Sequence, residues 1–246
     1  MVEVVRPDAF FARLGRDAKI GLGEAYMAGD WRAGPGTDLA DLLTPFAARL
    51  TSLVPQPLQR LRTIVDKRIP PSQENTLDGS RDNISAHYDL SNDLFAAFLD
   101  PTMSYSAAWF DESGSAATAT KLEGAQLRKI DGVLDYAGVE AGTRLLEIGT
   151  GWGALAIRAA QRGAYVTTVT ISAEQLALAA ERVAQAGLSD RVDLRQQDYR
   201  EVAGEFDSIV SVELVEAVGE AYWPTYFATI DPLLAPGGMV CIRAIT

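Results

Sequence analysis

A glycine-rich segment, Gly149-Thr-Gly-Trp-Gly153, follows an apolar run and precedes a helical pattern that begins near Ala154. Glycines in such a turn let the backbone approach a nucleotide and place the N–H groups of the following helix beside it. The spacing alone leaves two cofactor classes open, because Gly149, Gly151 and Ala154 also satisfy the Gly-x-Gly-x-x-Gly/Ala pattern of nicotinamide enzymes. We expect Gly149, Gly151 and Gly153 to contact a nucleotide cofactor.

Glu147, two residues before the first glycine, helps to separate the two classes. A carboxylate there would repel a pyrophosphate, but it suits the cationic ammonium or a hydroxyl group of S-adenosylmethionine. A nicotinamide site would also require an acid at the end of the second strand, about 20 residues further on. The chain has Thr170-Ile-Ser172 at that place. Both observations favour an S-adenosylmethionine-dependent methyltransferase over a dehydrogenase.

A polar pair, Asp198 and Tyr199, ends the third expected strand. Asp198 can accept a hydrogen bond from the amino group of an adenine, and Tyr199 can stack on its ring. A strand-ending turn without a ligand would have the same composition. The position after the third strand favours the role in cofactor binding.

Two residues are candidates for acid–base chemistry. Glu216 lies directly after the fourth expected strand, where active sites of open parallel sheets form, and aromatic residues that follow it could stabilise a cation. It is the best single candidate. His87 is the only histidine and could act as a base. Because a lone histidine is more often structural, His87 is a second-tier candidate.

Apolar runs that alternate with helical patterns must position these residues. The expected strands are 144–149, 164–172, 192–197, 206–212 and 239–245, and one of the helices between them is 172–185. This order predicts an α/β fold with a doubly wound, mostly parallel sheet. Residues 70–83 are polar and rich in turn formers, so we place a domain boundary there. Residues 1–75 form the first domain and residues 76–246 the cofactor-binding domain.

The first domain is expected to be small and helical. Apolar residues recur three and four apart after a capping aspartate at 8–14 and again at 38–43, and Gly34-Pro-Gly36 separates the two patterns. The segment 49–68 mixes apolar residues with Arg49, Arg60, Arg62, Lys67 and Arg68. It could dock on anionic lipid headgroups, or it could be a solvated face packed on the main domain. Both interpretations stay open.

Composition excludes several classes of protein. The net charge of −11 argues against nucleic acid as a partner. With His87 and Cys241 as the only histidine and cysteine, no transition-metal site is expected. The apolar neighbours of Cys241 predict a buried, reduced thiol. No apolar run is long enough to span a bilayer and no signal peptide is visible, so we expect a cytoplasmic protein.

With these residues in view, the chain resembles the cyclopropane-fatty-acyl-phospholipid synthase family of methyltransferases over nearly its whole length. The segments that carry the resemblance are 23–31 (GEAYMAGDW), 87–93 (HYDLSND), 98–106 (FLDPTMSYS), 147–153 (EIGTGWG), 169–175 (VTISAEQ), 197–200 (QDYR) and 211–219 (SVELVEAVG). No short glycine-rich motif could produce all of these matches.

The resemblance implies a class I methyltransferase fold and a set of residues around S-adenosylmethionine. Those residues are Tyr105, Ser106, Glu147, Gly149, Gly151, Gly153, Thr170, Ile171, Ser172, Gln175, Asp198 and Tyr199. Family members transfer the methyl group to a cis double bond of a phospholipid acyl chain and form a carbocation. A bound bicarbonate is the base that closes the cyclopropane ring. The family therefore implies peripheral contact with an anionic membrane at the inner face, and it leaves a homo-oligomer open.

The bicarbonate pocket that the resemblance implies is only partly present in this chain. Glu216 and Ile245 match it, but Ala107 stands at the cysteine position and Arg243 at the histidine position, and the tyrosine would lie beyond residue 246. Arg243 could hold bicarbonate through its fork of donors. The changed pocket could also direct the carbocation to a methylene branch, and later reduction would give a methyl branch. We favour branching over cyclopropane formation.

Two further expectations follow from the departures. The class I sheet continues beyond the fifth strand, so we expect the last strands to be missing from this chain and one edge of the sheet to be exposed. Two other functions also stay open: a methyltransferase for a soluble acyl or small-molecule acceptor, and a cofactor-binding protein without activity.

Overall fold

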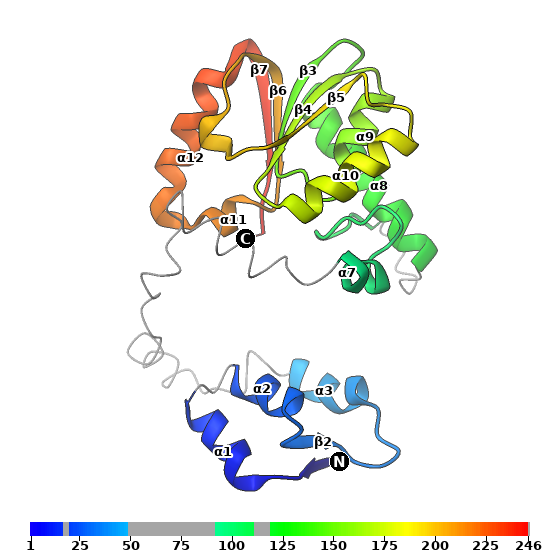
Figure 1. Ribbon diagram of the computed structural model, residues 1–246, viewed down its shortest axis with the longest axis vertical. Helices are drawn as coiled ribbons and strands as arrows, with labels where there is room; N and C mark the ends of the chain where they lie inside the picture. The colour runs from blue at the N-terminus through cyan, green and yellow to red at the C-terminus, as the bar shows by residue number, and fades with distance from the viewer. Residues whose placement is uncertain (17–19, 49–91, 111–118, 246) are drawn as a thin grey trace. The chain divides into compact units, whose positions relative to one another are not determined.

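The computed structural model describes residues 1–16, 20–48, 92–110 and 119–245. The chain divides into two compact units, Met1–Arg68 and Ile69–Thr246, which are described one at a time (Figure 1). The expected domain boundary after residue 75, the basic residues 49–68 and His87 lie outside the described residues.

The N-terminal unit combines a small antiparallel sheet with short helices. Its elements are β1 (Val2–Val4), α1 (Pro7–Arg16), α2 (Gly21–Met27), β2 (Trp31–Ala33) and α3 (Leu39–Ala47). The helices that the apolar spacing predicts at 8–14 and 38–43 are present as α1 and α3. The pairing of β1 with β2 was not predicted, because strands of three residues are too short to show an alternating pattern.

A buried charge organises the core of this unit. Phe10 and Trp31 pack in the core, and the adjacent Asp30 is fully buried. Asp30 forms ion pairs of 2.8 Å with Arg6 and with Arg13. A buried carboxylate is stable only when it is paired and hydrogen-bonded, so these arginines hold the segment before β2 against α1.

The C-terminal unit is a doubly wound α/β fold with a five-stranded parallel sheet, as predicted. Its elements are α7 (Asn92–Phe98), α8 (Ala119–Tyr136), β3 (Arg144–Ile148), α9 (Ala154–Gln161), β4 (Tyr165–Thr170), α10 (Ala173–Gln185), β5 (Val192–Gln196), β6 (Phe206–Val212), α11 (Val215–Val218), α12 (Trp223–Ile230) and β7 (Leu234–Arg243). The strand order is β5-β4-β3-β6-β7. The last strand starts earlier than residue 239, where we expected it.

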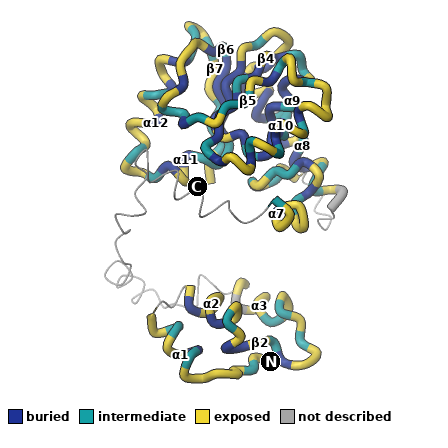
Figure 2. Tube along the Cα trace, in the orientation of Figure 1, coloured by how far each residue is buried: buried dark blue, intermediate teal, exposed yellow. Residues whose placement is uncertain are grey.

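The alternation of side chains in β3 explains the layers. Leu145 belongs to the cluster packed with α8, α9 and α10, whereas Leu146 and Ile148 belong to the cluster packed with α11 and α12. Figure 2 shows the central strands buried and the outer surfaces of the helices exposed. Since side chains alternate along a strand, Glu147 shares the face of Leu145 and points toward the α8 layer.

β7 is an edge strand of this sheet, hydrogen-bonded to β6. Met239 and Val240 on it are exposed, and Cys241 is half-buried rather than buried as expected, because the strand is at the edge. Burial raises the pKa of the Cys241 thiol. Within the described ranges, no helix has the length and apolar character needed to cross a membrane. The same residues contain no cluster of three or more metal-ligating side chains.

Candidate active site

A cavity of about 1050 Å³ opens at the carboxyl ends of the central strands. β3 has β4 on one side and β6 on the other, which is the switch point where doubly wound sheets bind ligands. The predicted site residues that line this cavity are Tyr105, Ser106, Glu147, Gly149, Gly151, Thr170, Ile171, Gln175, Asp198, Tyr199, Glu216 and Ile245. Gly153, Ser172 and Arg243 are not among the lining residues.

The glycine turn connects β3 to α9. Gly149, Gly151 and Gly153 have φ angles of 99°, 51° and 84°, a region that side chains other than glycine rarely adopt. A Cβ at Gly149 or Gly151 would meet open space, whereas a Cβ at Gly153 would lie 3.3 Å from the Cβ of Ala179 in α10. The first two glycines thus leave room at the cavity, and Gly153 allows α9 to pack closely on α10.

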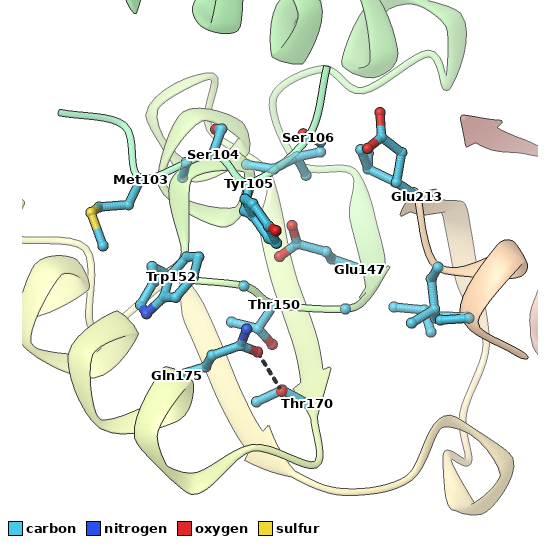
Figure 3. Close-up of a pocket in the computed structure, with 18 of the residues that line it drawn as sticks. Met103, Ser104, Tyr105, Ser106, Glu147, Thr150, Trp152, Thr170, Gln175 and Glu213 are labelled. Atoms are coloured by element: carbon cyan, nitrogen blue, oxygen red, sulfur yellow. Dashed lines mark hydrogen bonds between the residues drawn. The ribbon is translucent and has the colours of Figure 1, made fainter. Parts of the chain in front are cut away.

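Glu147 is a buried carboxylate that points into the cavity near Tyr105 (Figure 3). The hydroxyl of Thr168 donates to it at 2.7 Å, and the Thr150 hydroxyl lies 2.7 Å from that of Thr168. Complete burial raises the pKa of Glu147 to about 8, against the opposing effects of the Thr168 hydrogen bond and the charge of Lys129. A cation placed in the cavity would reverse this shift, because it stabilises the ionised carboxylate.

The end of β4 is ordered by its own polar side chains. Thr170 donates to the side-chain oxygen of Gln175 at 3.2 Å (Figure 3). Ser172 caps α10 by accepting from the backbone N–H of Gln175 at 3.2 Å. Thr170, Ile171 and Gln175 therefore face the cavity, while Ser172 fixes the start of the helix that carries Gln175.

Asp198 and Tyr199 lie at the cavity wall after β5. Arg200 donates to both carboxylate oxygens of Asp198, at 2.8 Å and 2.6 Å. The ring of Tyr199 meets Tyr226 edge to face at 5.3 Å, and the Arg200 guanidinium lies 5.6 Å from the centre of the Tyr199 ring. These contacts hold both predicted adenine-contacting residues in place. Oδ1 of Asp198 also accepts from the backbone N–H of Arg200, at 2.9 Å.

The loop after α7 carries Tyr105 and Ser106 over the cavity and is anchored by α8. Gln126 donates to the carbonyl oxygens of Ser104 and Ser106 at 3.2 Å and 2.7 Å. Lys129 donates to the Ser106 hydroxyl at 2.6 Å. Burial and the charge of Arg243 lower the pKa of Lys129 to about 8.

Arg182 in α10 ties the same loop to the glycine turn. Its guanidinium donates to the carbonyl oxygens of Pro101, Thr102 and Trp152, at 3.0 Å, 3.0 Å and 3.1 Å. The ring of Trp152 in turn packs on Phe95 of α7, with the centroids 4.8 Å apart. Three segments that are distant in the sequence are thus held around one edge of the cavity.

The end of the cavity beside β6 and β7 holds two glutamates. Glu216 accepts a hydrogen bond from the backbone N–H of Ile245. Glu213 accepts from the backbone N–H of Ala107 at 3.0 Å and from the guanidinium of Arg243. Arg243 reaches this region without lining the main cavity. It lines a second cavity of about 420 Å³.

Lys129, Gln126 and Glu213 line the cavity but were not predicted from the sequence. Lys129 and Gln126 are three positions apart, so they share a face of α8, and polar residues on a face that is otherwise apolar were an available signal. Glu213 directly follows β6, just as the glycine turn directly follows β3. From this segment we predicted Glu216 as the site residue and did not predict Glu213. His87, the remaining candidate, lies outside the described residues.

Comparison with known proteins shows the family of this chain. A family model described as mycolic acid cyclopropane synthetase matches residues 75–246. The chain is 52% identical over 243 residues to tuberculostearic acid methyltransferase UfaA1 of Mycobacterium tuberculosis, covering 98% of this chain and 56% of that protein. It is 36% identical over 258 residues to the cyclopropane-fatty-acyl-phospholipid synthase of Escherichia coli K12, covering 99% of this chain and 60% of that protein.

A solved structure gives the same family. The mycolic acid cyclopropane synthase CmaA1, in complex with SAH and CTAB, aligns with a TM-score of 0.60 and 32% identity, covering 66% of this chain and 55% of that one. The fold is that of a class I methyltransferase. The chain spans little more than half the length of the relatives it matches. On the extent of these matches, the chain belongs to the mycolic acid cyclopropane synthetase family.

Proposed function

We propose that this protein transfers the methyl group of S-adenosylmethionine to a cis double bond of a lipid acyl chain. One observation carries the proposal. A single cavity joins a glycine turn and a buried carboxylate, Glu147, to a mouth with exposed apolar side chains. Phe98, Tyr105, Phe110 and Ile245 all line the cavity and are 45–66% exposed. Apolar surface of this kind marks a binding site for apolar ligands.

The residues at the inner end of the cavity fit S-adenosylmethionine. Gly149 and Gly151 leave room for the nucleoside at the backbone, and Glu147 offers a carboxylate to a cationic group. Asp198 and Tyr199 fit the adenine as acceptor and ring partner. The cofactor would supply a methyl group that is activated by its bond to a positively charged sulfur.

The chain's own residues would then orient the cofactor and exclude water. Gln126 and Lys129 hold the loop that carries Tyr105 over the cavity, and a closed loop keeps water from the reacting carbon atoms. The ring face of Tyr105 and the carboxylates of Glu213 and Glu216 would stabilise a cation that forms on the acyl chain.

The proposal also names the substrate and the product. The acyl chain belongs to a phospholipid, because the Escherichia coli relative is named a fatty-acyl-phospholipid synthase. The product is a methylene or methyl branch, because the Mycobacterium relative is named a methyltransferase of tuberculostearic acid. Docking through residues 49–68 would place the N-terminal unit on anionic lipid.

Two measurements test the proposal. Isothermal titration calorimetry should show binding of S-adenosylmethionine and none of NADH, and binding of NADH alone would reject the cofactor assignment. Vesicles of an unsaturated phospholipid should then acquire label from methyl-labelled cofactor, while saturated vesicles should not. Equal labelling of a soluble acceptor and no labelling of lipid would favour the small-molecule alternative. Cofactor binding without transfer to any acceptor would favour an inactive cofactor-binding protein.

A further inference from the structure

The groups that would hold bicarbonate in this family are already occupied by the chain's own carboxylates. The N–H of Ala107 and the guanidinium of Arg243 both donate to Oε1 of Glu213. The N–H of Ile245 donates to Glu216. An added anion would lose these donors and would lie beside Glu213, a carboxylate that is not among the residues implied to hold bicarbonate. Bicarbonate therefore does not fit this arrangement.

The backbone places the Glu213 carboxylate at this point. Glu213 follows the last residue of β6, and its N–H donates to the carbonyl oxygen of Arg243 at 2.7 Å, which joins the ends of β6 and β7. Its φ angle is 51°, a left-handed conformation that costs about 1 kcal/mol for a residue other than glycine. Backbone strain of this kind concentrates at functional sites, where the surrounding contacts sustain it.

The contacts of Glu213 also orient its second oxygen. The side chain is 11% exposed and lines the cavity. Both donors converge on Oε1, so among the described residues Oε2 is the oxygen left to accept a proton. Figure 3 shows Glu213 entering the pocket from the end of β6, across from the loop that carries Ser106.

We propose that the Glu213 carboxylate takes the place of a bound anion and accepts the proton that the reaction releases, so that this enzyme does not require bicarbonate. The inference rests on the proposed function. One carbon of the double bond forms a bond to the methyl carbon, the methyl–sulfur bond breaks, and its electron pair stays on sulfur. The other carbon of the former double bond is left cationic.

Glu213 then takes one proton from the cation, and the electron pair of the broken C–H bond becomes a new carbon–carbon bond. Loss of a proton from the transferred methyl group closes a cyclopropane ring directly. If a hydride first shifts from the methylated carbon to the cationic one, the same loss gives a methylene branch. The protonated Glu213 returns its proton to water before the next turnover.

A binding experiment tests the inference without any turnover. The carbon-13 NMR signal of labelled bicarbonate should keep its linewidth with the wild-type protein. Glu213→Gly suits the left-handed backbone and frees the donors of Ala107 and Arg243, so this variant should broaden the signal. Glu181→Ala, on the exposed side of α10, is the matched control and should behave as wild type. Specific broadening by wild type that formate reverses would overturn the inference.

An activity experiment separates this inference from the proposed function. Wild type should transfer methyl groups at the same rate, within about twofold, in bicarbonate-free and bicarbonate-supplemented buffer. Glu213→Gln should lower kcat by about a hundredfold or more while the Kd for the cofactor stays within about twofold, since general bases contribute about that much. Formate should partly restore Glu213→Gly. Transfer that requires added bicarbonate, or a fully active Glu213→Gln, would overturn the role of Glu213. Transfer to no lipid under either condition would instead reject the proposed function.

Discussion

Binding of S-adenosylmethionine should release a proton from Glu147. Burial raises the pKa of this carboxyl to about 8. About nine-tenths of the molecules therefore carry a protonated Glu147 near pH 7 when the cavity holds no cation. A cationic cofactor stabilises the ionised form and lowers the pKa, so binding should release close to one proton from this residue.

The sign of the pH dependence follows from the same shift. Because the pKa is lower in the complex, cofactor affinity should rise with pH and level off above about pH 8. If the complex has a pKa of about 6 or less, affinity should be about fifty- to a hundredfold weaker near pH 6 than near pH 9. Lys129, whose pKa is also about 8, can add to the number of protons released. The Glu147→Gln variant separates the proton released by Glu147 from that released by Lys129.

Calorimetry in buffers of different ionisation enthalpy measures the released protons directly, because the observed enthalpy changes in proportion to them. Wild type should release about one proton near pH 7. Glu147→Gln should release markedly fewer and lose most of the pH dependence. Glu181→Gln on the surface of α10 should match wild type. An affinity independent of pH, with no proton released by wild type, would show that Glu147 does not change its protonation when the cofactor binds.

Three further outcomes follow from the packing around the site. Gly153→Ala should lower the free energy of unfolding by about 1–3 kcal/mol, because alanine is strained at this positive φ and its Cβ would also lie close to α10. Gly142→Ala has a similar φ but its Cβ would meet open space, so it should lower the free energy of unfolding by less. Urea denaturation of both variants measures the difference. Arg182→Ala should raise the Kd for the cofactor severalfold, and Arg182→Lys should restore little, since one ammonium cannot reach all three carbonyl oxygens. Unchanged affinity in Arg182→Ala would contradict this. Asp30→Asn should increase hydrogen exchange in α1 and β2 but leave the five-stranded sheet of the C-terminal unit protected. An equal increase of exchange in both units would argue against two separate units.

The central sheet was predictable because neighbouring residues in the sequence mark each of its strands. Each strand is an apolar run followed by a polar turn, and the glycine turn combines its conformational requirement and its chemistry in one segment. The N-terminal strand pair was not predictable in this way. Its strands have three residues each, and the buried Asp30 beside them is paired with Arg6 and Arg13, which are distant from it in the sequence.

Part of the candidate site was predictable because residues at or shortly after the carboxyl end of a strand face the ligand site of an open parallel sheet. Glu147, Asp198 and Glu216 were chosen for this reason, and all three line the cavity. Lys129 reaches the cavity from a helix that precedes the sheet, so its place at the site follows from tertiary packing and not from its position after a strand. Gly153 was expected at the cofactor, but it does not line the cavity, and a Cβ there would meet Ala179 of α10, which no local pattern encodes.

The proposed methyl transfer can be measured by mass spectrometry of phospholipid after incubation with the protein. With S-adenosylmethionine and an unsaturated phospholipid, we expect acyl chains heavier by one methylene unit. Fragmentation should locate the added carbon at the former double bond, as a branch rather than a ring. Unchanged lipid, in the presence of a protein that binds the cofactor, would contradict the claim that this cavity methylates acyl chains.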